Sequence, residues 1–235
     1  MGINLGMTSV IVHSDEPIAL FGGGEANADV IVRLPEIAKT LVAADGGANL
    51  ALAHNIMPNA VIGDFDSISD ATLAALPEDV LHIIDEQDST DFDKALRSIS
   101  APLILAIGFT GARIDHQLAA MSTLIARADQ RCVIVGESEI LFVCPPRLKL
   151  SIETGTVFSL FPMGQVEGTS VGLKWPIDGL VMAPDARVGT SNEVSGPIEL
   201  TMDCARMLVI LPISELDEVI SALLDNESLW PDGSR

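Results

Sequence analysis

Residues 60–67 read Ala-Val-Ile-Gly-Asp-Phe-Asp-Ser, an apolar run of the strand type that ends in an acidic cluster. Residues two apart in an extended segment point to the same side, so we expect Asp64 and Asp66 to offer their oxygens to one ion while Phe65 turns into the protein. Carboxylate oxygens are hard ligands that suit Mg²⁺, together with water and substrate phosphates. A solvated turn is the alternative, because Asp, Gly and Ser are frequent turn residues.

The same form recurs along the first half of the chain. Short apolar runs end in Gly or Asp at residues 18–25, 41–47, 60–67 and 103–111. Between them, residues 48–55 and 92–99 place apolar side chains at helical spacing. This alternation predicts an α/β fold with a mostly parallel sheet and helices on both faces. Ligands of such sheets bind beyond the carboxyl ends of the strands.

Residues 86–96 read as the entry to a helix. Asp88 could cap it, with Asp91 in the favourable first turn. Because Asp91 and Lys94 are one turn apart, they are also expected to face the same side. A carboxylate for metal and an ammonium for phosphate would then stand together at a helix N-terminus, which is itself suited to anions.

A glycine-rich turn at residues 111–118 delivers Arg113, Asp115 and His116 to the start of another helix. Arg113 is the best candidate for a bidentate phosphate contact, and a surface salt bridge is the alternative. Asp115 is either a site residue or only a cap.

Composition narrows the classes of function. The chain has 235 residues, 48% of them hydrophobic, so it can fill its own core. A formal charge of −20 argues against nucleic acid and favours cations. Cys132, Cys144 and Cys204 are odd in number and scattered, which predicts buried thiols rather than disulfides or a zinc site. The apolar runs are too short for a membrane span and the N-terminus lacks a basic signal region, so we expect a cytoplasmic protein.

Helical spacing fades after residues 144–147, where short strand-like pieces alternate with Gly and Pro. These pieces are residues 156–161, 179–182, 198–202 and 207–211. We therefore expect an α/β domain over residues 1–146 and a small antiparallel β-sandwich domain over residues 147–235. A final segment from Ser214 begins like a capped helix that packs on the outside.

Six motifs, in order, resemble the thiamin pyrophosphokinase family, whose members move a pyrophosphoryl group from ATP to thiamin and give thiamin diphosphate and AMP. They are residues 44–48 (ADGGA), 63–67 (GDFDS), 88–96 (DSTDFDKAL), 111–116 (GARIDH), 172–176 (GLKWP) and 189–192 (GTSN). Each motif is weak alone, but six in the family's order are specific and span nearly all of the chain. The resemblance implies a homodimer whose active sites join the nucleotide- and metal-binding α/β domain of one subunit to the thiamin-binding sandwich of the other.

By motif, the resemblance also implies roles for individual residues. The catalytic set is Asp64, Asp66, Asp91 and Asp115, of which the first three hold Mg²⁺. The nucleotide set is Asp45, Gly46, Gly47, Ser67, Gln87, Thr90, Lys94 and Arg113. The thiamin set is Asp115, Trp175, Ser191 and Asn192. Either Asp66 or Asp91 could take the proton of the thiamin hydroxyl, and the sequence does not separate metal ligand from base.

Trp175 has two interpretations. Its indole face can attract a thiazolium ring by roughly 0.5 to 2 kcal/mol through a cation–π contact. Alternatively, it is a tryptophan buried in the sandwich. The chain departs from the family at Ala120, where many bacterial members carry Asn, and in a longer helical tail after Leu211.

Two other classes of function remain open. The Asp64-x-Asp66 motif superficially resembles the nucleophile motif of haloacid-dehalogenase-like phosphatases, in which the first Asp is phosphorylated. A non-catalytic sensor of nucleotide or thiamin is the second alternative. A Rossmann dehydrogenase is least favoured, because residues 22–24 (GGG) do not form a G-x-G-x-x-G motif and no P-loop occurs.

Overall fold

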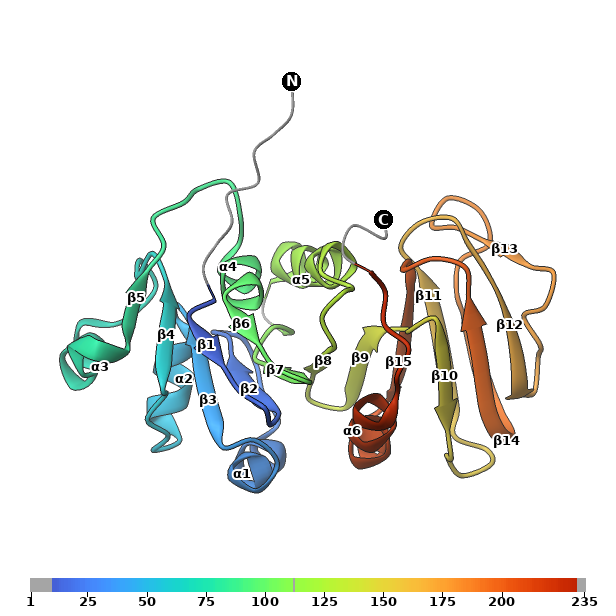
Figure 1. The fold of residues 1–235 in the computed structure, drawn as a ribbon, viewed down its shortest axis with the longest axis horizontal. Helices are drawn as coiled ribbons and strands as arrows, with labels where there is room; N and C mark the ends of the chain where they lie inside the picture. Colours follow the sequence, from blue (N-terminus) through green and yellow to red (C-terminus); the bar gives the residue numbers. More distant parts are fainter. Residues whose placement is uncertain (1–9, 112, 232–235) are drawn as a thin grey trace.

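The structure is a computed structural model that describes residues 10–111 and 113–231. Its first half contains a parallel sheet of six strands (Figure 1). In spatial order they are β5 (Leu81–Ile83), β4 (Ala60–Gly63), β3 (Thr40–Ala44), β2 (Ile18–Phe21), β7 (Ile104–Ile107) and β8 (Cys132–Val135). A separate small sheet pairs β1 (Val12–His13) with β6 (Ile99–Ser100). The expected strands at residues 18–25, 41–47, 60–67 and 103–111 are thus confirmed as β2, β3, β4 and β7.

Antiparallel strands extend the same sheet. From β8 outward they are β9 (Glu139–Val143), β15 (Met207–Pro212), β11 (Val157–Pro162), β14 (Thr190–Met202), β12 (Val166–Leu173) and β13 (Val181–Met182), with β10 (Arg147–Leu150) paired to β14. The first part of β14 pairs with β11, and its last part lies between β10 and β12. Pro197 lies between these parts, where a residue without an N–H is tolerated. The long strand therefore passes from one layer of the C-terminal sandwich to the other.

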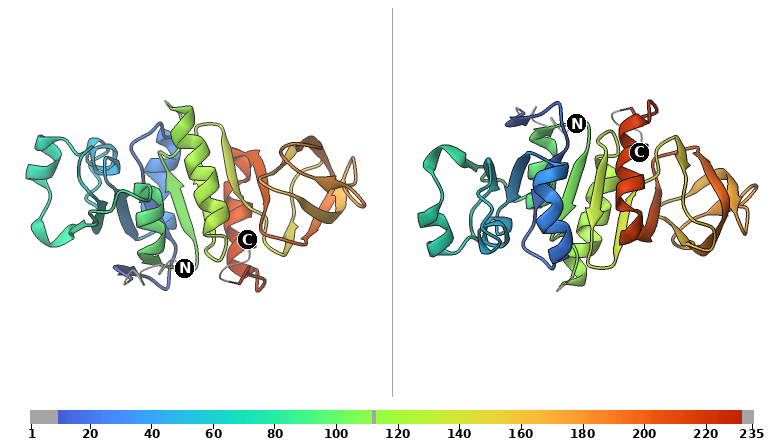
Figure 2. Two further views of the ribbon diagram at one scale, coloured as in Figure 1. Left: turned by 90° about the horizontal axis from the view of Figure 1, so that it is seen from above. Right: turned by 90° about the horizontal axis from the view of Figure 1, so that it is seen from below.

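Helices cover both faces of the sheet, as the alternating pattern predicts (Figures 1 and 2). They are α1 (Ala28–Ile37), α2 (Gly47–Ala53), α3 (Asp70–Ala75), α4 (Asp91–Arg97), α5 (Ile114–Ala126) and α6 (Leu216–Asp225), with short 3₁₀ turns at Glu78–Val80 and Ile213–Glu215. In β2, Ala19 and Phe21 pack into the core on the side of α1 and α2, whereas Ile18 and Leu20 pack into the core on the side of α4 and α5. A strand buried on both faces explains the continuous apolar run. No helix of the described residues is both long and apolar enough to cross a bilayer.

Two local expectations need correction. Thr90, not Asp88, caps α4, because its hydroxyl accepts a hydrogen bond from the Asp93 N–H at 3.2 Å. No side chain caps α6, since a 3₁₀ turn containing Ser214 leads directly into it. The helix nevertheless packs on the outside of the sheet as expected, through Leu216, Val219 and Leu223.

The C-terminal segment Asn226–Trp230 crosses the junction between the two halves of the molecule. Asn226 donates from Nδ2 to the Arg147 carbonyl at 2.7 Å, and Ser228 Oγ donates to the same carbonyl at 3.1 Å. Trp230 donates from Nε1 to the Cys144 carbonyl at 2.8 Å. Arg131, which precedes β8, donates to the Asn226 carbonyl. This C-terminal strap thus ties the connection between β9 and β10 to the α/β half.

The strap should stabilise the junction. Trp230→Ala removes a half-buried ring and its hydrogen bond, so we expect a loss of about 2 kcal/mol, or roughly 4 to 8 °C in the thermal midpoint. Trp230→Phe keeps most of the ring and should cost only about 1 kcal/mol. Hydrogen exchange at residues 144–150 should quicken in the Ala variant more than in the Phe variant. Unchanged exchange there in both variants would show that the strap does not restrain the junction.

Candidate active site

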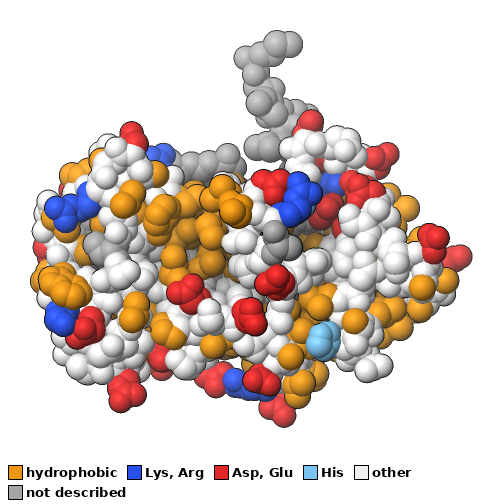
Figure 3. All heavy atoms as spheres, turned by 180° about the vertical axis from the view of Figure 1, so that it is seen from behind, with side chains coloured by type: hydrophobic (Ala, Val, Ile, Leu, Met, Phe, Trp, Pro, Cys, Tyr) orange, Lys and Arg blue, Asp and Glu red, His pale blue; other side chains and the backbone are white. Residues whose placement is uncertain are grey.

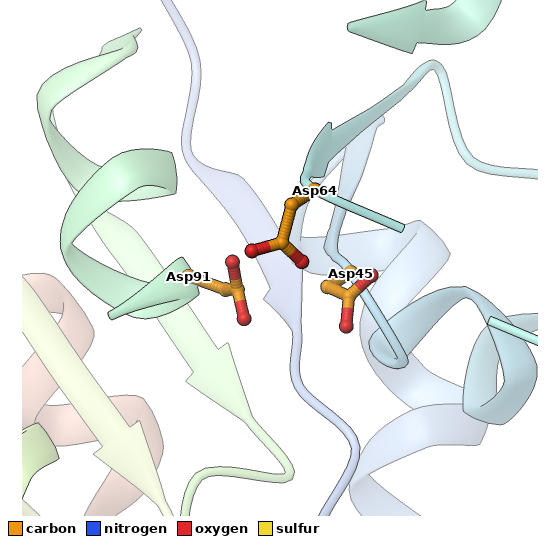
Figure 4. A group of neighbouring side chains, drawn as sticks. All are labelled: Asp45, Asp64 and Asp91. Carbon is orange, nitrogen blue, oxygen red and sulfur yellow. The ribbon is translucent and has the colours of Figure 1, made fainter. Parts of the chain in front are cut away.

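Three carboxylates meet where β3 and β4 end and α4 begins. Asp45, Asp64 and Asp91 each offer one oxygen, and these three atoms all lie within 4.8 Å of one another. Figure 4 shows the side chains pointing toward one another from three different elements. The spacing suits one divalent cation, because ligands on opposite sides of Mg²⁺ lie about 4.2 Å apart. We call these three residues the acid triad.

The backbone explains why Asp45 rather than Asp66 completes this group. Phe65 has a φ of 67°, so the chain leaves the extended conformation directly after β4. The two-residue alternation that would place Asp64 and Asp66 on the same side therefore does not apply. Phe65 packs against the core as expected. Asp66 is exposed, and its Oδ1 accepts a hydrogen bond from the Ser67 hydroxyl at 2.8 Å.

Asp45 is held in an unusual conformation. Its φ is 43°, a left-handed value that few non-glycine residues adopt. Its N–H donates to the Ile62 carbonyl at 2.9 Å, and its Oδ2 accepts from the Ser67 N–H at 3.2 Å. The residue is only 2% exposed, and its Oδ1 has no hydrogen-bond partner among the described residues. Strain and an unpaired buried oxygen at one position are typical of functional sites.

Lys94 lies behind two members of the acid triad. Its Nζ is 3.0 Å from Asp64 Oδ2 and 3.0 Å from Asp91 Oδ1. The hydrogen bond from Lys94 holds the pKa of Asp64 below its usual range. Burial by itself would lower the pKa of Lys94, but its bonds to both carboxylates outweigh burial and raise it. The ammonium group therefore remains charged in the folded protein.

A cavity of about 530 Å³ lies next to the acid triad. The loops after β2 and β7 form part of its wall, at the point where the chain leaves these neighbouring strands toward opposite sides of the sheet. Such topological switch points are where α/β sheets bind ligands. Of the sequence-predicted site residues, the cavity lining contains Asp45, Gly46, Ser67, Thr90, Asp91 and Arg113.

Glycine permits the two loops to touch. A Cβ on Gly22 would lie 2.5 Å from the Gly108 carbonyl oxygen, and Gly108 itself has a φ of 79°. The Gly24 N–H donates to the Gly108 carbonyl at 2.7 Å. Gly22, Gly24 and Gly108 were not predicted as site residues. The signal for them was present, because the loops after β2 and β7 follow apolar runs whose carboxyl ends are expected to face the ligand. His116 and Phe109 also line the cavity.

The remaining predicted nucleotide residues lie away from the cavity lining. Gln87 is exposed in the loop before α4, and Gly47 begins α2. Arg113 reaches the lining, but its guanidinium is paired with Asp115, with Nη2 2.6 Å from Oδ2 and Nε 3.1 Å from Oδ1. The pair is exposed, and hydrogen bonding from Arg113 lowers the pKa of Asp115 to about 2.

Trp175 is not a core residue. It lies between β12 and β13 and is 54% exposed, which rules out the interpretation as a buried sandwich tryptophan. Lys174 Nζ lies 4.9 Å from the centroid of its ring. Asn192 is buried and holds the backbone of Trp175: Oδ1 accepts from the Trp175 N–H at 3.1 Å, and Nδ2 donates to the Trp175 carbonyl at 2.7 Å. Asn192 thus fixes Trp175, while Ser191 is exposed beside it.

The acid triad and Trp175 lie near opposite ends of the chain's long axis. Figure 1 places β4 and α4 toward one end and β12 and β13 at the other. Seven strands separate β12 from β3 in the hydrogen-bonded order. With neighbouring strands about 4.8 Å apart, the eight steps from β12 to β3 span on the order of 40 Å along the sheet.

Comparisons with known proteins agree with this arrangement. The family model described as thiamin pyrophosphokinase, catalytic domain, matches residues 32–135, and the one described as thiamin pyrophosphokinase, vitamin B1 binding domain, matches residues 147–207. Thiamine pyrophosphokinase 1 of Arabidopsis thaliana is 30% identical over 193 residues, which cover 68% of this chain and 72% of the relative. The chain belongs to the thiamin pyrophosphokinase family. A relative from Caenorhabditis elegans, 32% identical over 178 residues, covers 67% of this chain and 72% of its own length.

Solved structures of thiamin pyrophosphokinases share the fold. The enzyme of Geobacillus thermodenitrificans has a TM-score of 0.69 at 24% identity, covering 83% of this chain and 96% of that one. Yeast thiamin pyrophosphokinase has a TM-score of 0.68 at 16% identity, covering 94% and 96%. The family models and the relatives confirm the family resemblance that the six motifs indicated. Members of this family are enzymes that make thiamin diphosphate. Neither the phosphatase nor the sensor alternative is supported.

Burial of Asp45, and next the charge of Asp91, raise the pKa of Asp45 above its ordinary value. A carboxyl group with a raised pKa binds its proton more tightly in the folded state than in the unfolded state. Its contribution therefore stabilises the fold at low pH and is lost as the pH rises through the folded-state pKa. At pH 7 the Asp45 charge destabilises the metal-free protein.

Asp45→Asn should consequently stabilise the metal-free protein at pH 7 by about 1 kcal/mol, or roughly 2 to 4 °C in the midpoint. Asn also tolerates the left-handed backbone. The gain should be smaller at pH 4 than at pH 7, because a carboxyl group with a raised pKa takes up its proton progressively as the pH falls. Thermal unfolding in chelator at both pH values is the measurement, with exposed Asp79→Asn as the control. A lower midpoint for Asp45→Asn at pH 7 would contradict the assignment of Asp45 as a destabilising charge.

Proposed function

We propose that this chain transfers the pyrophosphoryl group of ATP to the hydroxyl of thiamin, giving thiamin diphosphate and AMP. The observation that carries the proposal is the acid triad, with Asp45 buried and Asp64 and Asp91 partly buried, beside a cavity at the switch point of the sheet. Family membership supplies the reaction, and the triad and cavity supply the place for a polyphosphate with its metal ion.

Mg²⁺ is the proposed metal, and Asp45, Asp64 and Asp91 are the residues that would hold it. The unpaired buried oxygens Asp45 Oδ1 and Asp64 Oδ1 support this assignment, because an all-oxygen carboxylate set suits Mg²⁺ and a bound cation would compensate both atoms. When bound, the ion would neutralise charge that develops on the transferring phosphoryl oxygens. Asp66 belongs to the metal set by motif only, since its side chain lies outside the triad.

The nucleotide is proposed to occupy the cavity. Gly46, Ser67, Thr90 and Arg113 line it, and their N–H, hydroxyl and guanidinium groups are suitable partners for phosphate oxygens. Gln87 and Gly47 are assigned to the nucleotide on the family motif alone. Arg113 must exchange Asp115 for phosphate, which is inexpensive because their ion pair is exposed to solvent.

Little covalent chemistry falls to the protein in this reaction. The thiamin hydroxyl oxygen attacks the β-phosphorus of ATP, the bond from that phosphorus to the α-phosphate oxygen breaks, and AMP leaves. Orientation and charge neutralisation then dominate the rate. Asp66 is the better candidate for the hydroxyl proton, because Asp91 already shares Lys94 with Asp64 while Asp66 borders the cavity-lining Ser67.

Trp175 is proposed to stack on the thiamin rings, with Ser191 as a polar partner and Asn192 as the residue that fixes the indole. An exposed indole with its backbone clamped on both sides is a preorganised aromatic surface for a cation. Lys174 lies over the ring, so it must move or the substrate must use the other face. Asp115 is assigned to thiamin by motif.

A homodimer with shared sites is the proposed assembly. Trp175 and the acid triad of one chain are too far apart to touch one thiamin molecule, so the two groups of an active site would come from different subunits. An uncovered apolar face supports this. In β15 and β11, Ile210 is partly exposed and Phe161 is 39% exposed, and both side chains lie on the same face of the paired strands.

The opposite face of these strands packs against the core that contains α6. On the uncovered side, α5 adds exposed Ile114 and Leu118. Figure 3 shows hydrophobic side chains gathered in a hollow of the molecular surface. Apolar surface of this kind marks protein contacts, and a second copy of the chain is the proposed occupant. We also propose a cytoplasmic location, because Cys132 and Cys144 are buried free thiols.

Incubation with ATP, Mg²⁺ and thiamin tests the reaction. AMP and thiamin diphosphate should form in equal amounts, and Asp64→Asn should lower turnover by at least a hundredfold without changing the fold, since it removes a metal ligand at constant size. Exposed Asp79→Asn is the matched control and should keep full activity. Formation of ADP with thiamin monophosphate would instead identify a simple kinase, and near-normal turnover of Asp64→Asn at limiting Mg²⁺ would refute the metal assignment.

Mixed dimers test whether the site is shared. Asp91→Asn and Trp175→Ala subunits should each be poorly active alone, but a heterodimer of the two should regain about one intact site, because both defects fall in the same site and leave the other site whole. The control is a mixture of Asp64→Asn and Asp91→Asn subunits, which should regain nothing, since both defects lie in the acid triad. No recovery in folded, well-mixed heterodimers of the first pair would mean that the site is built within one chain.

A further inference from the structure

Lys94 is the most completely buried cation near the acid triad. It is 1% exposed, and its Nζ contacts Asp64 and Asp91 at 3.0 Å each. Thr90 and Asp91 line the cavity from the same helix, but Lys94 is not among the lining residues. Its ammonium group therefore faces the carboxylates from behind and not the space in which phosphates would lie.

We propose that Lys94 is a positioning residue, the built-in counter-ion of the acid triad, and not a ligand of the nucleotide phosphates. This inference rests on the proposed function insofar as the triad is taken as a metal site. Lys94 fixes Asp64 and Asp91 in the geometry that a divalent cation needs, and it lets the protein fold before any cation is bound.

Charge requires such a partner. Three carboxylates with oxygens within 4.8 Å repel one another, and the buried Asp45 is the least screened by water. Without a cation, a buried carboxylate loses its hydration with nothing in return. The Arg and Lys residues near this region otherwise pair elsewhere: Arg97 with Glu86 at 2.6 Å and Arg127 with Asp93 at 2.8 Å.

The division of oxygen atoms supports a positioning role. Asp64 uses Oδ2 and Asp91 uses Oδ1 to bind Lys94, while Asp45 uses Oδ2 to bind the Ser67 N–H. Asp64 Oδ1 and Asp45 Oδ1 are left buried without partners among the described residues. Lys94 and a metal ion would thus use different oxygens of the same carboxylates. Partners of this kind orient metal ligands in many metal sites.

Helix geometry makes the arrangement possible. Lys94 is three residues after Asp91, so the two side chains lie on one face of α4. That face packs against β3 and β4, the strands that precede Asp45 and Asp64. The buried Lys94 stem therefore carries its charge from the helix to the strand ends. Methionine has a stem of similar length without the charge, which makes Lys94→Met a suitable variant.

Thermal unfolding in chelator and with millimolar Mn²⁺ tests the proposal. Lys94→Met should lower the midpoint in chelator by about 5 to 10 °C, as expected when one partner of a buried charge group is removed. Mn²⁺ should raise the midpoint of Lys94→Met by more than it raises that of the natural protein, because the ion replaces the lost charge. Lys149→Met removes an exposed lysine paired with Glu199 and should show neither effect.

A double variant keeps the test decisive if Lys94→Met fails to fold in chelator. Lys94→Met combined with Asp64→Asn removes one charge of each sign and should be more stable in chelator than Lys94→Met alone. If the double variant is no more stable, the counter-ion proposal is overturned. This comparison needs no metal, so it is independent of the proposed reaction. Failure of Mn²⁺ to stabilise even the natural protein would count against the metal site instead.

Binding of a non-hydrolysable ATP analogue in chelator separates the two roles of Lys94. If Lys94 is a counter-ion, Lys94→Met should change the affinity for the analogue by no more than about twofold. Arg113→Met should weaken this affinity by about tenfold, because it removes a charged contact to phosphate. A tenfold loss in Lys94→Met, with an unchanged midpoint in chelator, would establish Lys94 as a phosphate ligand and overturn the proposal.

Discussion

Repulsion between like charges at the carboxyl edge of the parallel sheet is the constraint that shapes this protein. β3 and β4 are adjacent and parallel, so the acidic residues that follow them must come close together. Asp91 adds a third carboxylate from the start of α4. A positive charge next to the carboxylates reduces this repulsion, and the ammonium group of Lys94 provides it through its bonds to Asp64 and Asp91. The cluster still carries more negative than positive charge, which is the basis for the proposed cation site.

The continuous sheet has a second consequence. Because β15 pairs with both β9 and β11, the C-terminal strands extend the parallel sheet lengthwise instead of folding back over its carboxyl edge. Trp175 is consequently carried away from the acid triad of its own chain. The C-terminal strap, which ties Arg147 and Cys144 to the α/β half, restrains the connection between them. A restrained connection favours an active site completed by another subunit over one completed by closure of a single chain.

The sequence predicted the order of elements well, since the apolar runs at β2, β3, β4 and β7 are long enough to read directly and alternate with helical spacing. It also predicted Asp45, Asp64 and Asp91 as site residues, and the structure brings these three carboxylates together. It did not predict which carboxylates meet, because that depends on the left-handed backbone at Phe65, and pattern rules assume regular strands. The contacts of Lys94 could not be predicted either, because the spacing of residues shows which face of a helix they share but not which elements that face packs against. Trp175 could not be resolved from composition, since exposed and buried tryptophans occupy similar apolar surroundings in sequence.

The overall charge of −20 and a nucleotide substrate are compatible for a local reason. At physiological salt, exposed charges act over roughly 8 Å, so most of the acidic surface is screened from the cavity. Within that range the acid triad and Lys94 sum to a formal charge of −2 when all are ionised, which one divalent cation balances. Phosphate groups would then meet a neutral cluster with Arg113 and glycine-rich backbone N–H groups at its border, instead of a negative one. The acidic surface is thus compatible with the proposed binding of a nucleotide together with its metal ion.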